Sequence, residues 1–196
     1  MSLQERLRQA IKAAARKFNR TIDSYEPTFD ANPYPERLVT YYYVQALANA
    51  LGSGSVLLEV PVTGSSGKRR DNHIDALVFS EHDLVLAEFK RAWTPSHWKL
   101  LAADLKRLQE LAGREVRGRF RHGPQRRAWL LLGSDCWREA VANVWKSGSA
   151  AKGWAVPTPF LRADRDYVTV YRENGQDYDG YYLTWALVRL GESGSA

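Results

Sequence analysis

The chain has 196 residues, of which 28 are Lys or Arg and 22 are Asp or Glu, so its formal net charge is 28 − 22 = +6. Hydrophobic residues make up 44% and aromatic residues 12%, which excludes a chain that is disordered throughout. The single cysteine, Cys136, excludes an intrachain disulfide and a zinc site built from cysteines alone. No apolar run approaches the ~20 residues of a membrane span, and the first residues are charged. We therefore expect a soluble, cytoplasmic protein with no membrane partner.

Two helices are predicted at the start of the chain. Ser2 and Glu5 form a capping-box pattern, and apolar residues then recur at helical spacing over residues 2–18. After a loop, Pro35 suits the first turn of a second helix, which runs to about Leu51.

The pattern then becomes that of extended strands. Residues 56–62, 73–79 and 84–92 are apolar and rich in β-branched side chains, which predicts three consecutive strands. Thr94 and Pro95 begin a predicted helix that ends at Gly113. We expect the rest of the chain to form a strand over 128–132, a helix over about 135–146, and two strands over about 167–171 and 181–188.

The order α-α-β-β-β-α-β-α-β-β favours one α/β (α+β) domain over residues 1–196, with a mixed sheet flanked by helices. We expect its core to cover about residues 35–146. The N-terminal helix (2–18) and a C-terminal β-hairpin (about 165–190) would be additions to that core.

The basic residues gather in three segments. Residues 1–20 hold six bases and one acid, and residues 113–127 hold six arginines and one acid. The six arginines are Arg114, Arg117, Arg119, Arg121, Arg126 and Arg127, and the third segment is Lys68, Arg69 and Arg70. Clustered bases attract polyanions such as nucleic acid, although solvated faces that only aid solubility would give the same pattern.

The second and third predicted core strands carry the two acidic side chains of the main candidate site. Asp75 lies on the strand 73–79, and Glu88 lies on the strand 84–92, two residues before Lys90 and on the same strand face. A short turn would make these strands neighbours and bring both carboxylates to one end of the sheet. Converging carboxylates repel each other unless a cation lies between them, and oxygen ligands suit Mg²⁺ or Mn²⁺. The alternative is an ion triad that only stabilises the hairpin.

These residues resemble the signature of the PD-(D/E)XK nuclease superfamily, in which an Asp on one strand is followed by Glu-x-Lys on the next. The predicted order of helix, three-strand meander, crossover helix and further strand over 35–146 is similar to the restriction-endonuclease-like core of that family. The proline that precedes the aspartate in the strict signature is absent, because Ile74 stands there.

The resemblance implies an Mg²⁺- or Mn²⁺-dependent nuclease. Asp75, Glu88 and the backbone carbonyl of Phe89 would hold the metal. Lys90 would position or activate the attacking water and stabilise charge that develops on the phosphate.

Three further residues are candidates for the site. Glu36, in the first turn of the second helix, would be the additional catalytic glutamate that many members carry on that helix. Its alternative role is to interact with the helix dipole. Glu59 on the first strand and His73 on the second are candidates for auxiliary roles, and an ordinary strand position is the alternative for both.

Together these features predict a hydrolase that cleaves phosphodiester bonds, with DNA favoured over RNA. The basic segments would bind backbone phosphates, which gives affinity without sequence choice. The alternative is a non-catalytic module on the same fold that binds nucleic acid or protein. The acidic, tyrosine-rich C-terminal hairpin would serve as an interface with a protein partner or with a second copy of the chain.

Overall fold

The computed structural model describes residues 1–23, 36–52, 55–61, 73–92, 94–111, 127–151, 153–172 and 179–190. Within these ranges the fold is of the predicted α/β class, with four α-helices and a six-stranded sheet in the expected order. The helices are α1 (Leu3–Asp23), α2 (Glu36–Leu51), α3 (Pro95–Leu111) and α5 (Glu139–Ser147), with a short 3-10 helix, η2 (Thr158–Phe160). The strands are β1 (Ser55–Pro61), β2 (His73–Phe79), β3 (Asp83–Arg91), β4 (Arg127–Cys136), β5 (Asp164–Arg172) and β6 (Gly180–Arg189).

The sheet is open and mixed, with the strand order β1-β2-β3-β4-β6-β5. The first three strands form an antiparallel meander, and the chain then returns through α3 so that β4 runs parallel to β3. The C-terminal hairpin adds to the other side, where β6 pairs antiparallel with β4 and β5 pairs with β6. The hairpin therefore extends the central sheet.

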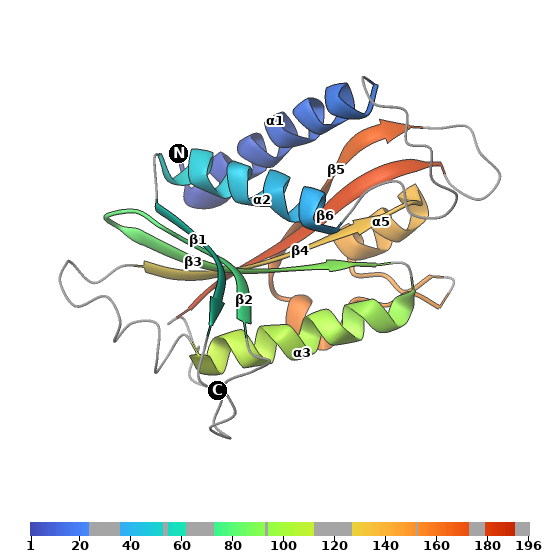
Figure 1. Ribbon diagram of the computed structural model, residues 1–196. Helices are drawn as coiled ribbons and strands as arrows, with labels where there is room; N and C mark the ends of the chain where they lie inside the picture. Colours follow the sequence, from blue (N-terminus) through green and yellow to red (C-terminus); the bar gives the residue numbers. More distant parts are fainter. Residues whose placement is uncertain are drawn as a thin grey trace.

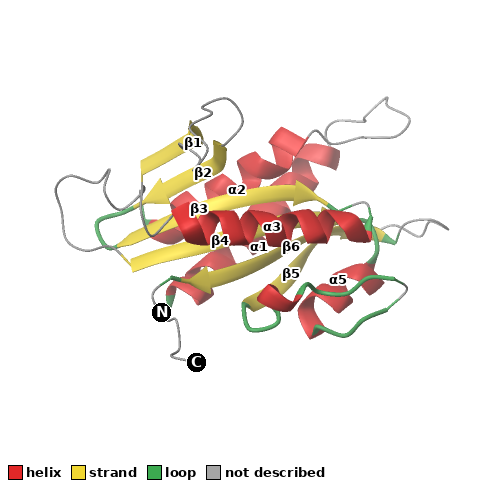
Figure 2. Cartoon of the chain, turned by 90° about the horizontal axis from the view of Figure 1, so that it is seen from below, coloured by secondary structure: helices red, strands yellow, loops and turns green. Residues whose placement is uncertain are grey.

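Helices cover both faces of the sheet, as Figure 1 shows: α1 and α2 lie above it, and α3 and α5 lie below. Seen from below, α3 lies along β3 and β4 (Figure 2). Val85, Ala87 and Phe89 of β3 belong to the core beneath α1 and α2, whereas Leu84 and Leu86 belong to the core beneath α3. Because side chains alternate along a strand, Glu88 and Lys90 face the α3 side. None of the helices in the described ranges is long and apolar enough to cross a membrane.

The local sequence accounts for α1 and α3, the longest described helix on each face of the sheet. In α1 the hydroxyl oxygen of Ser2 accepts a hydrogen bond from the Glu5 amide at 3.2 Å, which confirms the Ser2 half of the predicted capping box. The apolar stripe of α1 is buried, and so is that of α3, which consists of Trp98, Leu101, Leu105 and Leu108.

The prediction was wrong at the end of β4. We expected a strand over 128–132 and a helix from about Asp135, but β4 continues to Cys136 and α5 begins at Glu139. Gly133, Ser134 and Asp135 look like turn residues in isolation. Here they pair with β3 on one side and β6 on the other, and these two ladders keep the segment extended.

The glycine in this segment has a packing role beside β3. A Cβ atom at Gly133 would lie 2.6 Å from the ring of Phe89. That ring is stacked on Tyr43 of α2, with 4.8 Å between the ring centroids. Glycine therefore allows β4 to approach the end of β3 on which Glu88 and Lys90 lie.

Candidate active site

Asp75 and Glu88 lie side by side at one end of the β2–β3 pair. The register aligns Leu77 with Leu86 and Ala76 with Ala87, so its continuation by one residue places Asp75 opposite Glu88. The Asp75 carboxylate also accepts a hydrogen bond from the backbone amide of Phe89 at 2.8 Å. The predicted convergence of the two acidic side chains is thus present, while their chemical role stays a prediction.

Glu88 is one of the few charged side chains in the described core. It is only 1% exposed. Burial, reinforced by the neighbouring charge of Asp75, raises the pKa of Glu88 from 4.5 to about 8, although Arg107 partly opposes the rise. The carboxyl group therefore favours a proton at neutral pH unless another cation takes the proton's place.

Sequence reasoning missed two charged residues that α3 brings to this group. The Arg107 guanidinium donates to the Glu88 carboxylate through Nη2 and to the backbone carbonyl of His73 through Nη1 at 2.7 Å. Nη2 also lies 3.2 Å from an oxygen of Asp104. The signal in the sequence was Asp104 itself, a carboxylate placed between Leu101 and Leu105 on the apolar stripe of the helix that follows Glu-x-Lys.

Lys90 joins the same group of charges. Its ammonium lies 3.5 Å from the second carboxylate oxygen of Asp104. Burial alone would lower the pKa of Lys90, but Asp104, Glu88 and Asp75 outweigh that effect and the pKa is raised. Lys90 is therefore a cation at neutral pH, on the same face of β3 as Glu88, as predicted.

The auxiliary candidates are placed as follows. Glu59 is exposed. Its neighbours Leu58 and Val60 pair with Ala76 and Ile74 of β2, so the register places Glu59 opposite Asp75. Its backbone adopts a positive φ of 48°, which is unusual within a strand. The side chain of His73 is exposed, and its contribution to the site is the carbonyl that binds Arg107.

Glu36 is the first residue of α2. The buried residues of α2 belong to the core on the face opposite α3, whereas Glu88 and Lys90 face α3. The backbone arrangement thus places Glu36 in the other helix layer, and its catalytic role stays a prediction.

The predicted nucleic-acid contacts fall mainly outside the described residues. These are Lys68, Arg69, Arg70, Arg114, Arg117, Arg119, Arg121 and Arg126. Arg127 is described, and it lies at the start of β4, away from Glu88. Its guanidinium binds both carboxylate oxygens of Asp83, each at 2.9 Å, which gives it a structural contact there.

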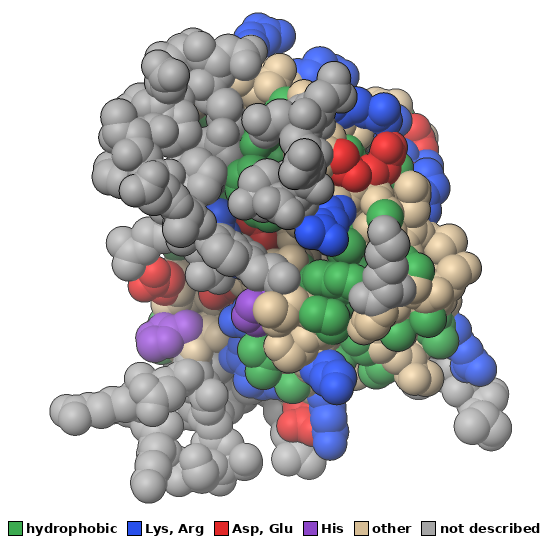
Figure 3. All heavy atoms as spheres, turned by 90° about the vertical axis from the view of Figure 1, so that its right-hand side faces the viewer, with side chains coloured by type: hydrophobic (Ala, Val, Ile, Leu, Met, Phe, Trp, Pro, Cys, Tyr) green, Lys and Arg blue, Asp and Glu red, His purple; other side chains and the backbone are tan. Residues whose placement is uncertain are grey.

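Basic and acidic side chains are also interspersed elsewhere on the described surface. Figure 3 shows this mixture on the side of the molecule that forms the right-hand side of Figure 1. In the basic N-terminal helix, Arg8 lies 3.3 Å from Asp166 and 3.7 Å from Asp164 on β5. Part of the N-terminal positive charge is therefore neutralised by the C-terminal hairpin.

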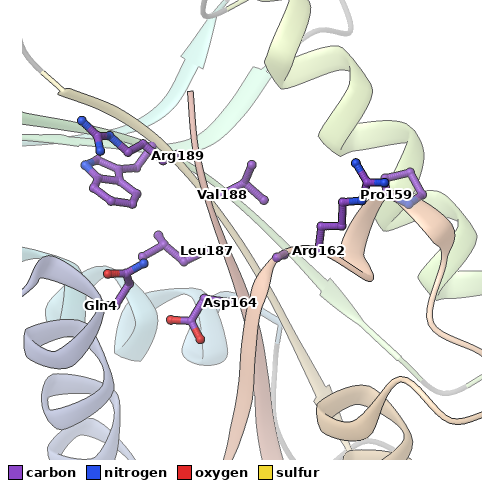
Figure 4. Close-up of a pocket in the computed structure, with 9 residues that line it drawn as sticks. Gln4, Pro159, Arg162, Asp164, Leu187, Val188 and Arg189 are labelled. Carbon is purple, nitrogen blue, oxygen red and sulfur yellow. The ribbon is translucent and has the colours of Figure 1, made fainter. Parts of the chain in front are cut away.

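A pocket of about 590 Å³ lies at a different place on the sheet. Figure 4 shows several of its lining residues, which come from α1, β5, β6 and the segment before β5. Trp129 and Arg189 line it, and these two residues pair with each other across β4 and β6. Trp129 also pairs with Val85 of β3, so the pocket lies near the end of β3 that carries Asp83. Asp75, Glu88 and Lys90 do not line this pocket, so it is separate from the group of charges under α3.

Within the described ranges, no three His, Cys, Asp or Glu side chains are arranged as a ready metal site. The group under α3 instead offers two adjacent carboxylates, with Arg107 bound to one of them. We also compared the chain with models of protein families, with curated proteins and with solved structures, and none of the three comparisons gave a match.

Proposed function

We propose that the chain is a metal-dependent nuclease, similar to the PD-(D/E)XK superfamily, that hydrolyses phosphodiester bonds in DNA. The observation that carries this proposal is the juxtaposition of Asp75 and Glu88, with Lys90 on the same face of β3. The three-strand meander, the crossover helix and the parallel β4 support it, because the resemblance implies that order for its core.

The donor atoms at this site suit Mg²⁺ or Mn²⁺. Asp75 and Glu88 would supply carboxylate oxygens and Phe89 would supply its backbone carbonyl, all of which are hard ligands. The amide of Phe89 points to Asp75. Because the N–H and C=O of one strand residue point to the same side, the carbonyl of Phe89 is also directed towards β2. When bound, the metal would neutralise phosphate charge and lower the pKa of a bound water.

The reaction would be the displacement of one ester oxygen from phosphorus by a water oxygen. One P–O bond forms and one breaks, and the proton lost by the water balances the proton gained by the leaving oxygen. Lys90 would hold the water or a phosphate oxygen, because its ammonium is a cation in a partly buried group of carboxylates. We favour DNA over RNA as the substrate, on the resemblance alone.

The strand order limits which strand of the C-terminal hairpin could form the expected interface. β6 is enclosed between β4 and β5, so a protein partner or a second copy that adds to the sheet there would pair with β5. This interface is part of the proposal and is independent of the site under α3.

A second candidate function is a non-catalytic module that binds nucleic acid or protein. The observation that favours it is the set of ion pairs that Arg107 and Lys90 make with Glu88 and Asp104. Such a network holds charged groups without a metal. The two candidates differ in one property, which is whether a divalent metal turns on cleavage.

The test is to incubate the protein with circular and linear DNA and with RNA, with Mg²⁺ or Mn²⁺, beside an EDTA control and the Lys90→Ala variant. We expect metal-dependent cleavage of DNA that EDTA abolishes. Loss of the Lys90 cation should slow it by about 100-fold, the usual effect of removing one group that stabilises transition-state charge. A wild type that cleaves none of these substrates with either metal would leave only the non-catalytic module.

A further inference from the structure

Arg107 of α3 is more exposed than Glu88, the acid of the motif that it binds. The Arg107 side chain is 26% exposed, whereas the side chain of Glu88 is 2% exposed. Arg107 therefore lies on the solvent side of a buried carboxylate. The guanidinium is thus the more accessible partner of this ion pair.

When all three acids of the group are ionised, its charges balance only if a further cation, a proton or a metal ion, is present. Asp75, Glu88 and Asp104 contribute −3 when ionised, and Lys90 and Arg107 contribute +2, so the sum is −3 + 2 = −1. A divalent metal would change the sum to +1. An anion with a single charge, such as one phosphodiester, would then restore neutrality at zero.

Asp104 contacts both cations of the group. One of its oxygens lies 3.2 Å from Nη2 of Arg107, and the other lies 3.5 Å from Nζ of Lys90. If a metal takes the Glu88 carboxylate from Arg107, Asp104 still holds the guanidinium beside Lys90. A planar guanidinium with several N–H donors is well matched to phosphate oxygens.

We propose that Arg107 is a further catalytic residue of this site, which binds Glu88 in the metal-free protein and binds the scissile phosphate when the metal is present. Asp104 is the positioning residue that keeps Arg107 next to Lys90. This proposal rests on the proposed nuclease function and adds to it a residue outside the Asp and Glu-x-Lys signature.

The role predicts effects of opposite sign on metal binding and on cleavage. Arg107→Ala removes a cation that competes with the metal for Glu88, so metal binding should become tighter. The same change removes a donor to the phosphate, so cleavage should become slower by about 100-fold. A residue that only stabilised the fold would weaken both properties together.

The experiment compares the wild type, Arg107→Ala, Arg107→Lys and Lys106→Ala. Lys106→Ala is the matched control, because it removes one positive charge from an exposed position of the same helix turn. Mn²⁺ affinity is measured by calorimetry without DNA, and single-turnover DNA cleavage is measured separately. We expect tighter Mn²⁺ binding and slower cleavage for Arg107→Ala, partial rescue of its cleavage by added guanidinium, intermediate rates for Arg107→Lys, and wild-type behaviour for the control.

The outcomes separate this proposal from the nuclease function. An inactive wild type overturns both. An active wild type overturns this proposal alone if Arg107→Ala keeps its cleavage rate, or if Arg107→Ala binds Mn²⁺ no more tightly than the wild type. If Arg107→Ala does not fold, as judged by circular dichroism, Arg107→Lys decides: a wild-type rate overturns the proposal, and slower cleavage with unchanged or tighter Mn²⁺ binding supports it.

Discussion

Strand β3 carries a buried carboxylate near each end, and the two ends are built differently. Asp83 is 2% exposed and Glu88 is 1% exposed. Two guanidinium nitrogens of Arg127 donate hydrogen bonds to the Asp83 carboxylate, and the indole N–H of Trp129 donates a third at 3.1 Å. The guanidinium of Arg6 lies 3.8 Å away. One acid there meets two cations, so its charge is fully compensated within the chain.

The Glu88 end has the reverse balance. Three carboxyl groups lie beside two cations, and the same nitrogen of Arg107, Nη2, contacts both Glu88 and Asp104. Equal burial on the same strand thus gives a closed structural contact at one end, and at the other end a group with more carboxyl groups than cations, in which Glu88 favours a proton. Burial of a charge is a weak sign of function by itself, whereas a buried carboxyl group whose pKa is raised by burial and by a second acid is a stronger one.

The largest expected effect separates the two ends by activity. Glu88→Gln keeps the shape of the side chain and removes a proposed metal ligand, so DNA cleavage should fall by at least about 1000-fold. The comparison variant is Asp83→Asn, which should keep its cleavage rate per folded molecule. Equal losses of cleavage in the two variants would mean that the ends do not differ in function.

The next effect separates them by stability. Asp83→Ala removes the partner of Arg127 and leaves the buried indole N–H of Trp129 without its acceptor, so the free energy of unfolding should fall by about 2–3 kcal/mol. Urea denaturation measures this change. The result would contradict the structural role of Asp83 if the variant unfolded at the same urea concentration as the wild type.

A smaller effect concerns pH. The pKa of Glu88 is about 8 in the folded chain, against 4.5 as its ordinary value, so the folded state holds an extra proton between these pH values. That contribution to stability is complete below about pH 4.5 and is lost as the pH rises through 8. The metal-free wild type should therefore lose about 2–8 °C in Tm relative to Glu88→Gln over this range, the shift that ~1–2 kcal/mol causes in a chain of this size. Parallel pH profiles of Tm for the two proteins would argue against a raised pKa.

The smallest effect concerns the edge of the group. Glu59 is exposed and lies across from Asp75, so Glu59→Gln should change the cleavage rate by less than about threefold, since an exposed charge acts weakly through water. A kinetic comparison at one metal concentration suffices. A loss of tenfold or more would move Glu59 from the rim into the site.

The sequence was sufficient to predict the order of the elements and the pair of acids, because both depend on local pattern. Period-two strands and a short turn make β2 and β3 neighbours, and that alone brings Asp75 opposite Glu88. The extension of β4 through Asp135 depends on ladders with β3 and β6, which no local pattern encodes.

The contribution of α3 was missed for a related reason. Which helix residues reach the sheet depends on how α3 lies along β3 and β4, and this is set by tertiary packing (Figure 2). Arg107 is an ordinary charged helix residue until its contact with Glu88 is known. Asp104, within a stripe of leucines, was the only local sign that this face of the helix meets charge.

The most direct test of the account is the binding of Mn²⁺ to the metal-free protein near pH 7, measured by isothermal titration calorimetry in two buffers of different ionisation enthalpy. Because Glu88 favours a proton there, we predict that binding releases close to one proton in the wild type. Glu88→Gln should release none and bind the metal weakly, while Asp83→Asn should match the wild type. Absence of Mn²⁺ binding in the wild type, or equal binding and proton release in Glu88→Gln, would contradict the claim that the Glu88 end of β3 is a metal site.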